Sequence, residues 1–251
     1  MDMGLKGKVA LVTGGSLGIG AASATLLARE GAKIVISARR EKELAESAAK
    51  IKAETGVEVM GVPTDCTKED DVRELVRRTV DKHGRVDILV NSIGSAKAGD
   101  FLKLTDEDWQ FSLSLKLMGQ MRVARAVYPY MEKQGWGRIV NVIGTHAQLA
   151  EAHAMPAGVA NAGLLNFTRA LAELGGPKGV LVNAVSPGTV NTARLKYLLD
   201  NGVTYDLKTI TLGRFAEAVE IANAIVFLAS ERASYCCGSV ITVDGGQLKT
   251  I

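Results

Sequence analysis

Apolar residues along this chain follow two alternating patterns, which are short β-branched runs and longer stretches with helical spacing. The short runs predict strands at Val9–Thr13, Lys33–Ser37, Val57–Pro63, Val86–Asn91, Arg138–Ile143, Val180–Val185 and Ser239–Val243. The longer stretches predict helices at Gly18–Glu30, Glu41–Thr55, Lys68–His83, Asp106–Gln134, Ala157–Leu174 and Ala216–Ser230. Strands that alternate with helices of this length indicate βαβ crossovers and a parallel sheet.

The most apolar runs show which kind of parallel sheet to expect. Val9–Val12 and Ile139–Ile143 are almost continuously apolar, which is typical of strands covered on both faces. No linker, low-complexity tract or internal repeat interrupts the series. We therefore expect one α/β domain over residues 1–251, with a Rossmann-type doubly wound sheet. The least regular stretch, Asn191–Leu212, is predicted to lie over the carboxyl edge of the sheet as a mobile lid.

Composition and charge narrow the possible partners and compartment. The chain is 47% hydrophobic with a net charge of +3, and its basic residues are dispersed, which argues against nucleic-acid binding. The polar start, Met1–Lys8, and the lack of any apolar run of about 18 residues argue against a signal peptide or a membrane span. Cys66, Cys236 and Cys237 form neither a disulfide framework nor a metal motif. We expect a cytoplasmic protein that acts on a small molecule and holds no metal.

A glycine-rich turn joins the first predicted strand to the first predicted helix. It reads Thr13-Gly14-Gly15-Ser16-Leu17-Gly18-Ile19-Gly20. Glycines let the backbone turn tightly and approach a pyrophosphate, and the free N–H groups at a helix start favour its negative charge. The strand–turn–helix context that this motif requires is present. The sequence therefore predicts dinucleotide binding at Gly14, Ser16, Leu17, Gly18, Ile19 and Gly20.

The end of the second predicted strand distinguishes NADP(H) from NAD(H). A carboxylate there would bind the ribose 2′-hydroxyl of NAD(H), whereas an arginine would bind the 2′-phosphate of NADP(H). The chain reads Ser37-Ala38-Arg39-Arg40, with no carboxylate before Glu41. Guanidinium groups pair well with phosphate, so Arg39, together with Arg40, favours NADP(H) over NAD(H). A solvated pair of surface arginines is the alternative.

The spacing Gly14-x-x-x-Gly18-x-Gly20 resembles that of the short-chain dehydrogenase/reductase family, and further motifs agree in order over nearly the whole chain. Asp65-Cys66 resembles the segment beside the adenine, and Asn91-Ser92-Ile93-Gly94 resembles the segment that braces the sheet next to the cofactor. Asn183-Ala184-Val185-Ser186-Pro187-Gly188 with Thr192 resembles the segment that holds the nicotinamide. The resemblance implies cofactor contacts from Asp65, Cys66, Asn91, Ile93, Gly94, Pro187, Gly188, Val190 and Thr192.

The residues that usually handle the proton in this family are different in this chain. The family moves hydride between nicotinamide and a carbonyl or alcohol, with an Asn-Ser-Tyr-Lys tetrad. Counted from the neighbouring motifs, the four positions hold Lys116, Gly144, Ala157 and Asn161. No tyrosine is followed four residues later by a lysine anywhere in the chain. Because the pKa of free tyrosine is about 10, the family's tyrosine depends on that lysine. The resemblance thus implies an atypical member.

Three groups are candidates for the missing acid–base chemistry. Lys116 stands where its ammonium could enter the space left at Asn161, or could instead extend to solvent. His146 and His153 fall in the segment that lines the family's substrate pocket, where each could be a general acid–base group or an ordinary pocket-wall or surface histidine. Thr145, next to the serine position, could supply a hydroxyl.

Three functions remain open at this stage. The first is an NADP(H)-dependent oxidoreductase with a non-standard acid–base set. The second is a catalytically inactive NADP(H)-binding protein, and the third is a non-redox enzyme for elimination, hydration or hydrolysis that uses the same pocket. The resemblance also implies a homodimer or homotetramer, formed through the helices at Asp106–Gln134 and Ala157–Leu174.

Overall fold

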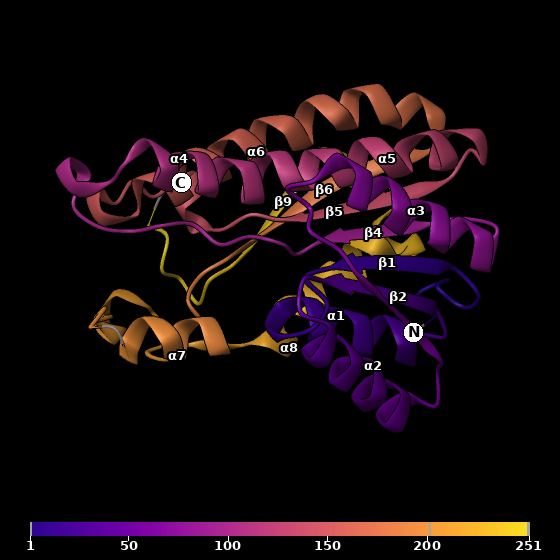
Figure 1. Ribbon diagram of the computed structural model, residues 1–251, viewed down its shortest axis with the longest axis horizontal. Helices are drawn as coiled ribbons and strands as arrows, with labels where there is room; N and C mark the ends of the chain where they lie inside the picture. Colours follow the sequence, from indigo (N-terminus) through magenta and orange to yellow (C-terminus); the bar gives the residue numbers. More distant parts are fainter. Residues whose placement is uncertain (1, 201, 250–251) are drawn as a thin grey trace.

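The computed structural model describes residues 2–200 and 202–249, and a seven-stranded sheet runs through the middle of this part (Figure 1). The strand order is β3-β2-β1-β4-β5-β6-β9, and every pairing is parallel. The strands are β1 (Val9–Thr13), β2 (Lys33–Ala38), β3 (Val59–Pro63), β4 (Ile88–Asn91), β5 (Gly137–Val142), β6 (Val180–Pro187) and β9 (Val240–Val243). The strand order reverses between β1 and β4, which confirms the doubly wound fold and locates its switch point.

Helices cover both faces of the sheet. Figure 1 shows α1 (Gly18–Arg29), α2 (Glu41–Thr55) and α8 (Ala218–Ala229) on one face. The other face carries α3 (Glu69–His83), α5 (Gly119–Lys133) and α6 (Met155–Gly175). Two large buried apolar clusters lie between these helices and the sheet, which explains why the central strands are apolar on both sides. No helix in the described ranges is long and apolar enough to span a membrane.

The single helix predicted over Asp106–Gln134 is confirmed as a continuous helical segment, but it contains a π-helical turn. It divides into α4 (Asp106–Ser112), a π-helical turn (Leu113–Met118) and α5. A π-helical turn inserts one extra residue into the helix without ending it. Apolar residues keep their helical spacing on each side of the turn, so the sequence still predicts one helix. The turn contains Lys116 and points this residue toward the sheet edge. Such turns occur often at functional sites.

The prediction of an irregular lid over Asn191–Leu212 is wrong in part. This segment contains α7 (Ala193–Asp200) and a short 3₁₀ turn (Leu207–Thr209). Just before it, β7 (Val190–Asn191) pairs with β8 (Ala216–Glu217) in a separate two-stranded sheet. In Figure 1, α7 stands apart from the main sheet. The sequence does not predict this helix, because most of its side chains are exposed and its apolar residues show little helical periodicity.

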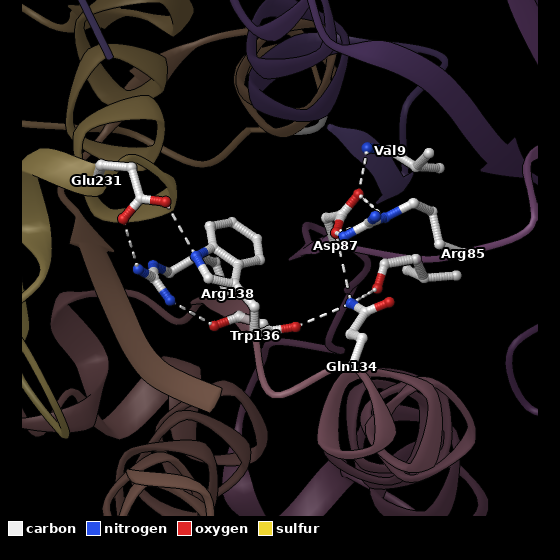
Figure 2. A network of polar contacts seen from close by, with 9 residues as sticks. Val9, Arg85, Asp87, Gln134, Trp136, Arg138 and Glu231 are labelled. Atoms are coloured by element: carbon white, nitrogen blue, oxygen red, sulfur yellow. Dashed lines mark hydrogen bonds and ion pairs between the residues drawn. The ribbon is translucent and has the colours of Figure 1, made fainter. Parts of the chain in front are cut away.

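A polar network fastens the opposite, amino edge of the sheet (Figure 2). The fully buried Asp87 carboxylate accepts hydrogen bonds from the Val9 backbone N–H at 2.8 Å and from Arg85 Nε at 2.9 Å. Nearby, the buried Arg138 guanidinium lies 3.3 Å from a Glu231 carboxylate oxygen. These contacts join β1, β4, β5 and the segment after α8. The carboxyl edge is left open for a site.

Candidate functional site

The glycine turn after β1 has the tight backbone that a pyrophosphate site needs. Gly14 has φ +67°, and a Cβ added to it would lie 2.6 Å from the carbonyl oxygen of Ser92. A Cβ on Gly20 would lie 2.2 Å from the carbonyl oxygen of Gly14, so no larger residue fits there. No side chain in the described residues caps the start of α1 at Leu17. Its first N–H groups therefore remain available to an anion.

The segment after β6 lies across this turn. A Cβ on Gly18 would be 3.2 Å from Cγ2 of Thr192, which places the threonine directly over the turn. Pro187 and Val190 are buried, and Gly188 lies against Asp244. The structure thus brings the predicted pyrophosphate and nicotinamide segments together, although about 170 residues separate them in sequence.

The two arginines after β2 differ in their surroundings. Arg40 Nε lies 3.0 Å from Oε1 of Glu43, whereas exposed Arg39 has no ion pair within the described ranges. Arg39 also lies near Asp65. Burial opposes ionisation of Asp65, but hydrogen bonds from Thr67 and the charge of Arg39 outweigh it and lower the pKa of this carboxyl. Arg39 is therefore the cation that is free to meet a phosphate.

Buried amides hold the central strand ends in place. The Asn91 side-chain amide donates to Oδ1 of Asn141 at 3.1 Å, and its own oxygen accepts from the Thr13 hydroxyl at 3.3 Å. The carbonyl oxygen of Ile93 accepts from Gln120 Nε2 at 2.9 Å. Burial raises the pKa of the Cys66 thiol to about 12, so this cysteine stays a neutral thiol and does not act as a nucleophile.

Lys116 turns inward. Its Nζ donates to the carbonyl oxygen of Ile143 at 3.0 Å, and its aliphatic stem lies against Gly94, where an added Cβ would be 3.0 Å from Lys116 Cγ. Burial, assisted by the charge of Arg194, lowers the pKa of Lys116 to about 8. The ammonium therefore lies against the end of β5 with a pKa of about 8, and the alternative of a side chain extended to solvent is wrong.

Gly144 and Asn161 lie in contact beside Lys116. Gly144 follows Ile143, and a Cβ on it would be 3.1 Å from Nδ2 of Asn161. Asn161 is 3% exposed, and its Oδ1 has no hydrogen-bond partner in the described part of the chain. Ala157 lies one turn earlier on α6 and is partly buried. Among the described residues, this corner of the site therefore contains a buried acceptor without a hydrogen-bond partner.

The two candidate histidines share one carboxylate. Nε2 of His146 lies 3.0 Å from Oε2 of Glu151, and Nε2 of His153 lies 3.4 Å from the same oxygen. Thr145 is buried beside them. Among the described residues, no hydrogen bond joins either histidine to Lys116. The histidines therefore form a cluster of their own.

Sequence reasoning missed two residues of the lid segment. Arg194 donates to the Ser95 hydroxyl and to the Ala96 carbonyl oxygen, both at 2.9 Å. The pKa of the Tyr205 phenol is raised, chiefly by burial. The charge of Arg194 opposes this shift, and the charge of Glu151 adds to it. The only sequence signal was an arginine and a tyrosine within a predicted lid. Within the described ranges no group of His, Cys, Asp or Glu side chains could hold a metal ion.

Comparison with known proteins identifies the family. Residues 14–247 match the family described as enoyl-(acyl carrier protein) reductase. The 3-oxoacyl-[acyl-carrier-protein] reductase FabG of Thermotoga maritima is 35% identical over 247 residues, which cover 97% of this chain and 99% of that protein. This chain belongs to the short-chain dehydrogenase/reductase family. A dehydrogenase subunit of that family from Thauera aromatica, BbsD, is 34% identical and covers 98% of each chain.

Solved structures extend the likeness to the whole fold. The L-sorbose reductase of Gluconobacter frateurii, solved in complex with NADPH and L-sorbose, matches this short-chain dehydrogenase/reductase with a TM-score of 0.93. The two chains are 36% identical, and the match covers 100% of both. Two reductases and a dehydrogenase subunit at this level of identity place the chain among the oxidoreductases of the family.

Proposed function

We propose that this chain is an NADP(H)-dependent oxidoreductase that reduces a carbonyl compound, or oxidises the corresponding alcohol, with Lys116 as its proton-handling residue. The inward Lys116 ammonium, 3.0 Å from the carbonyl oxygen of Ile143, is the observation that carries the proposal. The cofactor, when bound, supplies hydride to the carbonyl carbon. The residues of this chain bind the cofactor and supply the proton.

The proposed cofactor contacts follow the carboxyl edge of the sheet. The turn from Gly14 to Gly20 receives the pyrophosphate, since its first helical N–H groups are uncapped. Arg39 pairs with the 2′-phosphate, which selects NADP(H), while Arg40 stays on Glu43. The remaining contacts come from Asp65, Cys66, Asn91, Ile93, Gly94, Pro187, Gly188, Val190 and Thr192. The NADPH complex of the related L-sorbose reductase supports this choice of cofactor.

The proton follows a separate route from the hydride. As hydride reaches the carbonyl carbon, the carbonyl oxygen takes one proton, and Lys116 Nζ donates it and is recharged from solvent. With a pKa of about 8, this lysine is protonated at neutral pH and is acidic enough to release the proton during the reaction. Gly144, Ala157 and Asn161 stand in the family's other three positions and offer no acid–base group.

Substitution of Lys116 tests the proposal. Lys116→Met is expected to lower kcat for NADPH-dependent carbonyl reduction at least a hundredfold, the usual contribution of a general acid being about 10²–10⁴. The Kd for NADPH should stay within a factor of two of the wild-type value. Lys103→Met, which removes an exposed lysine, is the matched control. An active Lys116→Met enzyme combined with an inactive His146→Gln or His153→Gln enzyme would transfer the role to the histidine cluster around Glu151.

A catalytically inactive NADP(H)-binding protein is the second candidate. Its support is that Ala157 and Gly144 carry no group that can move a proton. Tight NADPH binding without loss of NADPH absorbance over a broad carbonyl panel would favour it. A non-redox activity in the same pocket, such as hydration or elimination, would instead turn over substrate with the nucleotide unchanged.

A further inference from the structure

Two cations approach the same short segment after β4. Gly94 lies against the aliphatic stem of Lys116. The next two residues hold Arg194, which donates to the Ser95 hydroxyl and to the Ala96 carbonyl oxygen. Lys116 comes from the π-helical turn and Arg194 from α7, so the fold joins two distant elements at one point. The charge of Arg194 also lowers the pKa of Lys116, which agrees with this proximity.

Neither cation has a carboxylate partner within 4.0 Å in the described residues, unlike basic residues close by. Lys97, the next residue along the same segment, lies 3.6 Å from a carboxylate oxygen of Asp108. Arg214, two residues beyond the lid segment, pairs with Glu220 at 2.8 Å. Two like charges that lie close together without a counter-charge repel one another, and Lys116 also loses hydration through burial. A bound anion would remove that cost.

Arg194 retains the geometry to bind such an anion. A guanidinium has five N–H donors, and the segment after β4 occupies two of them. The remaining donors suit carboxylate or phosphate oxygens. The Arg194 side chain is exposed, so a ligand from solvent can reach it. The cofactor pyrophosphate has its own place at the glycine turn, over which Thr192 rather than Arg194 lies.

We infer that the substrate is an anionic carbonyl compound, with a carboxylate or phosphate that Arg194 binds while Lys116 faces the carbonyl oxygen. This inference rests on the proposed oxidoreductase function, because it assigns the substrate class of that same site. The two cations then have distinct roles. Arg194 fixes the anionic end, and Lys116 handles the proton at the reacting end.

Matched substrates test the charge requirement directly. NADPH oxidation is measured with 2-oxo acids and 3-oxo acids, with the methyl ester of each, and with ketose phosphates and the free ketoses. The wild-type enzyme is expected to favour the anionic member of a pair at least tenfold in kcat/KM. The better of the acid and phosphate series identifies the anionic group. Equal or better turnover of the neutral members would overturn the inference and leave the proposed function standing.

Substitution of Arg194 tests which residue reads the charge. Arg194→Gln is expected to raise KM for the anionic substrate at least tenfold, with a smaller change in kcat and none for the neutral analogue. Arg194→Lys should recover part of the loss. Lys208→Gln removes another exposed cation of the lid segment and should behave as wild type. Ser95→Ala removes one anchoring contact but keeps the charge, so it should retain the preference for the anion.

Two further outcomes separate the explanations. An Arg194→Gln enzyme that binds NADPH more weakly and loses both substrate types alike would assign Arg194 to the cofactor or to lid closure, against the inference. If no carbonyl compound is turned over, the proposed function fails, and binding decides the inference. Malonate and inorganic phosphate are then titrated into the NADP⁺-loaded protein in a thermal-shift experiment. Stabilisation of the wild type but not of Arg194→Gln supports the anion site, and no stabilisation of either overturns it.

Discussion

Protonation of Lys116 determines the pH dependence expected of the enzyme. Reduction needs the protonated ammonium, and burial lowers the pKa of this group to about 8. We therefore expect kcat/KM for reduction to be constant below pH 8 and to fall about tenfold per pH unit above it. Alcohol oxidation, which needs the neutral amine, should show the opposite trend. Initial rates across this range, in buffers of constant ionic strength, measure both profiles.

A histidine acid would give a different profile. The inflection would then persist in Lys116→Met and disappear in His146→Gln or His153→Gln. A profile without any inflection near pH 8 would contradict the role of Lys116.

Arg39 and Arg40 allow a second prediction at the residue scale. Arg39→Ala should weaken NADPH binding roughly tenfold to a hundredfold, because it removes a charge-assisted contact to the 2′-phosphate. NADH binding should hardly change, since NADH lacks that phosphate. Arg40→Ala serves as the matched control, because Glu43 already pairs with this side chain at 3.0 Å. Fluorescence titration of the wild type and both variants with each nucleotide gives six dissociation constants, and equal losses in the two variants would contradict the assignment.

Single residues also show where sequence reasoning reaches its limit. The turn at Gly14 and Gly20 could be predicted, because the need for bare backbone is local and leaves its mark on adjacent positions. Arg194 could not, because its partners Ser95 and Ala96 are about 100 residues away in sequence. Nor could the sequence choose between the inward and outward conformations of Lys116. That choice depends on the carbonyl oxygen of Ile143, which only the packed sheet brings within reach.

At the scale of elements, the close contact between the end of β5 and α6 predicts a coupled pair of substitutions. Gly144→Ala would put a Cβ 3.1 Å from Nδ2 of Asn161, so this change alone should destabilise the protein by about 1–3 kcal/mol. Asn161→Ala removes the obstacle, and the double variant should recover only part of the loss, because Gly144 has φ +154°, a backbone conformation that side chains rarely adopt. Urea unfolding of the wild type and the three variants gives the coupling free energy. Additive effects would show that the two residues do not obstruct each other.

The elements also differ in how well the sequence predicted them. Strands and amphipathic helices that pack on the sheet were predicted closely, because burial imposes their periodicity. The π-helical turn between α4 and α5 was missed, since it does not end the helix and helical apolar spacing continues on both sides of it. The helix α7 was missed because only Leu195 among its residues is buried.

At the scale of the whole molecule, exposed apolar residues predict self-association. Tyr130 on α5 is 39% exposed, and Val159 and Leu174 on α6 are 50% and 53% exposed. We expect a homodimer or homotetramer through these helices, measurable by light scattering. Val159→Glu should shift the mass toward the monomer, whereas Val219→Glu, at a similarly exposed valine on the opposite face, should not. A wild-type protein that is monomeric at micromolar concentration would contradict this expectation.

The strand order has a consequence for how the chain reaches this fold during synthesis. The apolar cluster beneath the sheet combines α1 residues such as Leu27 with α8 residues such as Ile221 and Ile225, and β6 gains its outer neighbour only when β9 arrives. A nascent chain still held by the ribosome therefore has its dinucleotide turn early but cannot close the layer behind it. Until α8 has emerged, α1 exposes apolar surface that chaperones recognise. The dinucleotide-binding turn is therefore synthesised early, whereas the helix α8 that packs against α1 behind it is synthesised late.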